Sequence, residues 1–329
     1  MSDSRQVPTY TLDPEPELRE IATGLIFPEG PIALPDGSFV LVEMVGNTLT
    51  RITADGRREV IANIHTGPNG AAIGPDGRCY VCVNGGIGQK LPPDAGKPNK
   101  APTMAQVGWP PIESDGGSIR VVDLKTGRTE VLYEECNGWP LTAPNDLVFD
   151  GNGGFYFTDL GKQSQRVWVR GRVYYARADG SSIQEVIVPL DAANGIGLSR
   201  DEKTLYVAQT AFARLWAFDI TAPGVVHTER APTMGGRLLA ALPRMGGFDS
   251  LALDADGNIC VGTLHPGAIT VIAPDGSSIR EIPMPDASAT NICFGGPDLR
   301  TAYITLSRSG RLVAMPWPVP GQPLNCLNK

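Results

Sequence analysis

The stretch NDLVFDGNGGFYFT, residues 145–158, decides the fold, because five other segments of the chain repeat its pattern. Each segment has a short apolar run, a turn and a second apolar run. An Asp or Asn stands seven residues after the first position of every segment, and in four segments a Gly follows it. This pattern is typical of a β-hairpin, since the Asx side chain closes the turn and Gly accepts a positive φ.

The other five segments lie on both sides of this stretch. They read EGPIALPDGSFVLV (29–42), NGAAIGPDGRCYVC (69–82), NGIGLSRDEKTLYV (194–207), DSLALDADGNICVG (249–262) and NICFGGPDLRTAYI (291–304). Their first residues are separated by 40, 76, 49, 55 and 42 residues. A unit near 40 residues matches one four-stranded propeller blade. The sequence therefore predicts an all-β, six-bladed β-propeller with four-stranded antiparallel blades, formed by residues 1–329 as a single domain.

Two segments depart from the repeat. The spacing of 76 residues marks an insertion in the second blade, at about residues 88–116, which is rich in Pro, Gly, Lys and Asp and is predicted to form a long loop over one face. Too little chain follows Asn291 to supply a full last blade. We expect residues 10–23 to provide its missing strand, so that an N-terminal strand closes the ring.

Composition and charge indicate which partners and which cell compartment to expect. The chain has 329 residues, 42% of them hydrophobic, and a net charge of −7 without a basic run, which argues against a nucleic-acid partner. It shows no secretory signal and no run of about 18 apolar residues, so we expect a cytoplasmic protein without a membrane partner. Six scattered cysteines are expected to be reduced. Cys79 and Cys82 would face opposite sides of a strand and could not share a metal ion.

The first residue of each repeat carries an oxygen-bearing side chain. The first strand of every propeller blade lines the central channel, so these side chains are predicted to form a ring around one axis. Asn and Asp are also ordinary turn residues at the starts of strands. That alternative explains neither the glutamate nor the complete set. The six residues are Glu29, Asn69, Asn145, Asn194, Asp249 and Asn291.

Two carboxylates in such a ring call for a cation. At about 4–5 Å and an effective dielectric near 20, Glu29 and Asp249 would repel each other by on the order of 3–4 kcal/mol. Carboxylate and amide oxygens match Ca²⁺ best, with Mg²⁺, Mn²⁺ or Zn²⁺ as alternatives. With only three histidines in the chain, a His-rich zinc site is poorly supported. His265, after the fifth hairpin, and Trp109, within the insertion, are predicted substrate contacts, with ordinary loop packing as the alternative.

Five stretches resemble the SMP-30/gluconolactonase/luciferin-regenerating family of propellers. They are FPEGPIALPDGSFVLVE, APNDLVFDGNGGFYFTD, NGIGLSRDEKTLYVA, FDSLALDADGNICVGTL and TNICFGGPDLRTAYIT. The resemblance runs from about residue 26 to residue 316. It implies one divalent cation, commonly Ca²⁺, bound by four residues. By position these are Glu29, Asn145, Asn194 and Asp249.

The resemblance also implies hydrolysis. Members of the family open sugar lactones, and relatives hydrolyse organophosphate esters. Asn69 is expected to line the substrate pocket, and Asp249 is expected to act as general base or nucleophile in addition to binding the cation. Animal gluconolactonases carry an Arg two residues before the blade-three Asn, where this chain has Ala143, so a substrate other than gluconolactone is indicated.

Three functions remain open from the sequence. The first is a divalent-metal-dependent lactonase acting on a small lactone or ester. The second is a phosphotriesterase-like hydrolase that uses the same cation. The third is a non-enzymatic propeller scaffold stabilised by Ca²⁺. No G-x-S-x-G nucleophile motif occurs, because no Gly follows Ser250 at the required position.

Overall fold

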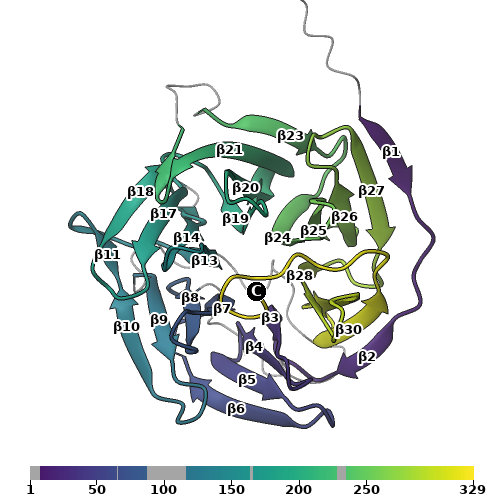
Figure 1. Ribbon diagram of the computed structural model, residues 1–329, viewed down its shortest axis with the longest axis horizontal. Helices are drawn as coiled ribbons and strands as arrows, with labels where there is room; N and C mark the ends of the chain where they lie inside the picture. The colour runs from purple at the N-terminus through teal and green to yellow at the C-terminus, as the bar shows by residue number, and fades with distance from the viewer. Residues whose placement is uncertain (1–7, 65, 87–115, 164–165, 228–234) are drawn as a thin grey trace, which may run out of the picture.

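Six β-sheets stand like blades around one central axis (Figure 1). The computed structural model describes residues 8–64, 66–86, 116–163, 166–227 and 235–329. The predicted all-β six-bladed propeller with four-stranded antiparallel blades is confirmed. Most of the predicted insertion, with Trp109, lies outside the described residues.

The first three blades follow one another along the chain. Blade one contains β3 (Pro28–Ala33), β4 (Phe39–Glu43), β5 (Thr48–Ile52) and β6 (Arg58–Asn63). Blade two contains β7 (Pro68–Ile73), β8 (Cys79–Val83), β9 (Ser118–Val122) and β10 (Thr129–Tyr133). Blade three contains β13 (Pro144–Phe149), β14 (Gly154–Asp159), β17 (Arg172–Arg177) and β18 (Ile183–Ile187).

The remaining blades complete the ring. Blade four contains β19 (Ala193–Leu198), β20 (Thr204–Gln209), β21 (Arg214–Ala222) and β23 (Arg237–Ala241). Blade five contains β24 (Gly247–Leu253), β25 (Ile259–Leu264), β26 (Ala268–Ile272) and β27 (Ser278–Pro283). Blade six contains β28 (Ala289–Gly295), β29 (Thr301–Leu306), β30 (Arg311–Pro316) and β2 (Arg19–Ala22). Short elements in the connections are β11 (Glu135–Cys136), β12 (Trp139–Pro140), β15 (Lys162–Gln163), β16 (Trp168–Val169), β22 (Val225–Val226) and the 3₁₀ turn η1 (Thr210–Phe212).

Burial of both sheet faces explains the composition of the second strands. Each blade packs between two neighbours, so every residue of β4, β8 and β14 is buried. Their sequences are accordingly near-continuous apolar runs. In each of the outer strands β6, β10 and β18 all residues but one are instead exposed or half-buried, because their outer face meets solvent.

Hydrophobic clusters between neighbouring blades hold the ring together. Cys79 packs in the cluster shared by blades one and two, with Val40, Val42 and Val81. Cys82, three residues later, packs in the cluster between blades two and three, with Phe155. The prediction that these two cysteines face opposite sides of one strand is therefore confirmed. Within the described chain, no helix has the length and apolar character needed to cross a membrane.

The N-terminal segment closes the ring with two strands. β2 pairs antiparallel with β30 and becomes the outer strand of blade six, as predicted. β1 (Thr9–Leu12) was expected in the same blade, but it pairs in parallel with β27 at the outer edge of blade five. Figure 1 shows the two strands one after the other along the rim, β1 beside β27 of blade five and β2 beside β30 of blade six. The N-terminal segment thus adds one strand to blade five and one to blade six, and so connects these two blades.

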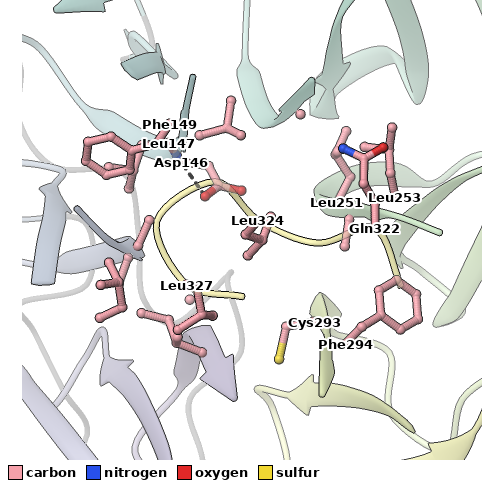
Figure 2. Close-up of a pocket in the computed structure, with 18 of the residues that line it drawn as sticks. Asp146, Leu147, Phe149, Leu251, Leu253, Cys293, Phe294, Gln322, Leu324 and Leu327 are labelled. Carbon is pink, nitrogen blue, oxygen red and sulfur yellow. Dashed lines mark hydrogen bonds between the residues drawn. The ribbon is translucent and has the colours of Figure 1, made fainter. Parts of the chain in front are cut away.

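The C-terminal segment crosses one end of the central channel (Figure 1). Gln322 Nε2 donates to the Leu198 carbonyl at 2.9 Å, and Asn325 Nδ2 donates to the Phe149 carbonyl at 3.0 Å and to Glu202 at 2.8 Å. Leu324 and Leu327 face an apolar cavity that the inner strands enclose beneath the segment (Figure 2). The segment therefore links blades three and four across this end of the channel.

Removing residues 321–329 should destabilise the protein. The truncation deletes the three side-chain hydrogen bonds of Gln322 and Asn325 and the two backbone hydrogen bonds that Gly321 and Gln322 donate. At about 1 kcal/mol each, we expect the free energy of unfolding to fall by about 5 kcal/mol. Urea denaturation measures this change. The control Lys329→Ala removes only the half-exposed Lys329 side chain, with its ion pair to Glu202 and its hydrogen bond to Asn325 Oδ1, and should change stability by less than about 1 kcal/mol. A truncated protein as stable as the full chain would contradict this role of the segment.

Candidate metal centre

A β-bulge interrupts the inner strand of every blade near its first residues. The register between the first and second strands shifts between Glu29 and Ile32 in blade one, and between Pro144 and Leu147 in blade three. The same shift occurs in the other four blades. A bulge places two residues opposite one and re-aims their side chains. The repeated bulge therefore explains how polar side chains at the starts of apolar strands turn toward the channel.

Glycine lets the bulges of neighbouring blades approach closely. A Cβ atom at Gly30 would lie 2.7 Å from the Ala71 nitrogen of blade two. A Cβ at Gly70 would lie 2.5 Å from the Asn145 carbonyl oxygen, and one at Gly195 would lie 2.5 Å from the Asp249 carbonyl oxygen. Real Cβ atoms essentially never approach this closely. Each of these glycines directly follows a predicted ring residue, so the missing side chain brings the ring together.

Five predicted ring residues line one pocket on the axis. Apolar residues and threonines complete the described part of the wall. The ring residues in this pocket are Glu29, Asn69, Asn145, Asn194 and Asp249. The sixth, Asn291, lines the opposite cavity beneath the C-terminal segment, and its Oδ1 accepts a hydrogen bond from the Ile292 backbone at 2.8 Å. Because the bulge of blade six is displaced by one residue, Thr290 faces the pocket in its place.

The carboxyl groups in and beside this pocket resist ionisation. Burial, followed by repulsion from Asp249, raises the pKa of Glu29 well above its ordinary value. Burial raises the pKa of Asp249 from 3.8 to about 7, while the Asn194 side chain opposes this shift by hydrogen bonding. Asp146 adds a third carboxyl, whose pKa burial also raises to about 7. The site thus concentrates negative charge that protons or a cation must neutralise.

Two amide oxygens in the pocket lack hydrogen-bond donors. Asn145 Oδ1 and Asn194 Oδ1 are buried, and neither has a hydrogen-bond partner among the described residues. A buried acceptor without a donor is costly, and a cation would satisfy it. Two such oxygens beside two carboxylates are the hard oxygen donors that Ca²⁺ prefers. The residues therefore fit a divalent cation held by Glu29, Asn145, Asn194 and Asp249.

Buried hydroxyl groups fix the bulges relative to one another. Thr158 Oγ1 accepts a hydrogen bond from the Asp146 backbone N–H at 3.1 Å and donates to the Asn194 carbonyl at 2.5 Å. Ser307 Oγ donates to the Pro28 carbonyl at 2.6 Å, next to Glu29. The contacts from Thr158 to Asn194 and from Ser307 to Pro28 each join two neighbouring blades beside a ring residue. These hydroxyls were not predicted, because no sequence signal distinguishes them from other strand threonines and serines.

A carboxylate at the end of the second strand anchors the chain before Asn145. Asp159 accepts hydrogen bonds from the backbone N–H groups of Thr142 at 2.7 Å and Ala143 at 2.8 Å. Glu43 has the same place in blade one and accepts from the Ile26 N–H at 2.7 Å. Both acids end their strands in the sequence, FVLVE and GFYFTD, which is the signal that could have identified them. They position the residues that lead into the ring.

One predicted substrate contact, His265, is not among the described residues of the pocket wall, and the other, Trp109, lies outside the described residues. His265 is exposed and is absent from the described lining, although its neighbour Leu264 is part of it. The His265 carbonyl accepts a hydrogen bond from Arg244 at 2.8 Å. The roles of both side chains therefore stay predictions.

Comparison with known proteins gives a consistent result. Residues 27–308 match the family described as SMP-30/Gluconolactonase/LRE-like region. The chain is 31% identical to the lactonase drp35 of Staphylococcus saprophyticus over 283 residues, which cover 85% of this chain and 76% of the relative.

Solved structures share the fold. A gluconolactonase from Xanthomonas campestris superimposes with a TM-score of 0.70 at 22% identity, covering 96% of this chain and 99% of the other. The calcium-binding protein regucalcin from Agrobacterium tumefaciens superimposes with a TM-score of 0.72 at 18% identity, covering 98% of this chain and 100% of the other. At these identities the two structures support the fold alone.

Replacing Gly195 by Ala should disrupt the ring. The new Cβ would force the bulges of blades four and five apart, so we expect a loss of about 1–3 kcal/mol of stability and at least roughly tenfold weaker Ca²⁺ binding. Calorimetric titration and urea denaturation measure the two effects. Gly116→Ala is the matched control, because its nearest neighbour, the Leu141 carbonyl, lies 3.4 Å away. Unchanged Ca²⁺ binding in Gly195→Ala would argue against the close approach.

Stability should depend on pH and on the cation together. Between about pH 4 and pH 7, the folded protein without a cation holds more protons on Asp146 and Asp249 than the unfolded chain does. Its free energy of unfolding should therefore fall as the pH rises through this range. Added Ca²⁺ should stabilise the protein more at pH 8 than at pH 5, since protons compete for the same carboxylates. Urea denaturation with EDTA or with Ca²⁺ tests this, and equal stabilisation at both pH values would contradict it.

Proposed function

The chain belongs to the SMP-30/gluconolactonase/LRE-like family, and we propose that it is a divalent-metal-dependent hydrolase that opens a lactone. One observation carries this proposal. A pair of carboxyl groups with raised pKa values shares a pocket with two buried amide oxygens that accept no hydrogen bond from any described residue. The names of the relatives, lactonase and gluconolactonase, support a lactone as the substrate. The name of the calcium-binding relative supports Ca²⁺ as the cation.

The chemistry divides between the cation and the chain. A bound divalent cation polarises the ester carbonyl and lowers the pKa of a water molecule. Glu29 and Asp249 would balance its charge, and the orphan oxygens of Asn145 and Asn194 would complete the protein ligands. Four protein ligands leave positions for water and for the substrate.

Asp249 is the residue we assign to the proton transfer. It is the ring carboxylate with a partly exposed surface, whereas Glu29 is buried. As general base it would take a proton from water while the water oxygen bonds to the carbonyl carbon. The ring C–O bond then breaks, and the leaving oxygen takes up a proton to give the hydroxy acid. As nucleophile, Asp249 would instead form a transient acyl anhydride that water opens.

Lactone hydrolysis followed by pH-stat tests the proposal. Protein treated with EDTA should be inactive and should recover activity with Ca²⁺, Mg²⁺, Mn²⁺ or Zn²⁺, which would also identify the preferred ion. Asp249→Asn should reduce kcat by about 10²–10⁴-fold, the range for a lost general base. Asn291→Ala, outside this pocket, is the matched control and should keep most of the activity.

The class of substrate that is hydrolysed, together with Ca²⁺ binding, distinguishes the lactonase from the phosphotriesterase and the scaffold. Turnover of a phosphotriester with no turnover of any lactone would contradict the proposal and would favour the phosphotriesterase-like hydrolase. Bound Ca²⁺ without any hydrolysis would favour the scaffold. Loss of turnover in Asp249→Asn with Ca²⁺ still bound would establish the proton-transfer role apart from ligation. Transfer of ¹⁸O from labelled water to the Asp249 carboxyl in a single turnover would identify the nucleophile.

A further inference from the structure

The described wall around the ring residues is mainly apolar. Blade one contributes Phe27 and Met44, and blade three contributes Leu160. Ala192 comes from blade four and Leu264 from the end of β25 in blade five. Phe27, Met44, Leu160 and Ala192 belong to one buried cluster, which gives the wall a fixed shape.

Ala143 completes this cluster. It is fully buried among these side chains, two residues before Asn145. The segment of blade three that leads into Asn145 therefore carries only the methyl group of Ala143 at this position. The backbone N–H of Ala143 is already engaged by Asp159 at 2.8 Å, so the residue offers a substrate no free donor.

Few polar groups remain for a substrate apart from the predicted cation ligands. Among the described lining residues there is no Lys, Arg or His. The Thr290 hydroxyl already pairs with Thr305 at 2.9 Å and with Ser307 at 2.5 Å. Thr210 Oγ1 is buried without a partner in the described part of the chain, and Asn69 contributes an amide. These two groups could satisfy one or two substrate oxygens.

Resting on the lactonase function proposed above, we infer that the substrate is a lactone with an apolar substituent, not a polyhydroxylated sugar lactone. A sugar lactone carries hydroxyl groups on most of its ring carbons. Against this wall, several of them would lose hydrogen bonds to water without finding a partner, which is unfavourable. An alkyl substituent would instead bury apolar surface against Phe27, Met44 and Leu160. The orphan hydroxyl of Thr210 is available for one oxygen of such a substrate.

A pair of six-membered lactones tests the inference directly. We compare δ-decalactone with D-glucono-δ-lactone on the Ca²⁺-loaded full chain by pH-stat. The value of kcat/KM should be at least about 100-fold higher for δ-decalactone, the order of selectivity seen when a hydrophobic pocket meets an added hydroxyl. Equal or faster opening of D-glucono-δ-lactone would overturn the inference while leaving the lactonase function intact.

A binding measurement separates this inference from the proposed function. If neither lactone is opened, the lactonase function fails, and calorimetry with two δ-lactams still tests the pocket. The lactam of 5-aminodecanoic acid should bind at least about tenfold more tightly than D-glucono-δ-lactam. Equal or tighter binding of the sugar lactam would overturn the apolar specificity.

Substitutions in the wall provide the matched test. Leu160→Asn and Met44→Gln keep the side-chain size but add an amide, and each should lower the ratio of the two kcat/KM values by at least about tenfold. Leu238→Asn on the outer strand β23, where the side chain is 36% exposed, should leave the ratio unchanged. Ca²⁺ titration checks that each variant keeps the ring. An unchanged ratio in a wall variant that still binds Ca²⁺ would contradict the assignment of the wall.

Discussion

The close approach of the inner strands at their bulges is the constraint on which the site depends. Three glycines, Gly30, Gly70 and Gly195, follow ring residues at points where a Cβ would lie 2.5–2.7 Å from the next blade. The contacts run from blade one to blade two, from two to three and from four to five. Hydrophobic clusters between the blades supply the cohesion that holds the strands this close. The same packing that stabilises the ring therefore brings its polar side chains together.

This convergence has an electrostatic consequence. Three carboxyl groups, Glu29, Asp146 and Asp249, are drawn into the centre of the ring, and desolvation is the largest cause of the raised pKa in each. Nearby, the side-chain oxygens of Asn145 and Asn194 have no donors. Without a cation this arrangement is unfavourable to folding above neutral pH. With a cation it becomes a ready-made set of ligands, and the apolar wall around it lowers the local dielectric and strengthens the attraction.

Much of the fold could be predicted because it repeats. The repeated hairpin pattern, with an Asp or Asn at the same position of each segment, identified six blades, and the oxygen-bearing first residues located five of the side chains that line the pocket. Asn291 shows where the repeat misleads, since a one-residue displacement of the bulge turns it to the opposite cavity and presents Thr290 instead. A one-residue displacement of a bulge requires no particular residue type, so it could not be predicted from the sequence. The parallel pairing of β1 with β27 was also missed, because an exposed edge strand carries no apolar pattern that names its partner.

The central claim is that one cation occupies the axis of the propeller, and a crystal structure of the full chain soaked in Mn²⁺ tests it most directly. Anomalous scattering locates the ion without assumptions about its ligands. We predict one strong peak in the pocket, bonded to side-chain oxygens of Glu29, Asn145, Asn194 and Asp249. A soaked crystal with no anomalous peak within bonding distance of these four side chains would contradict the account.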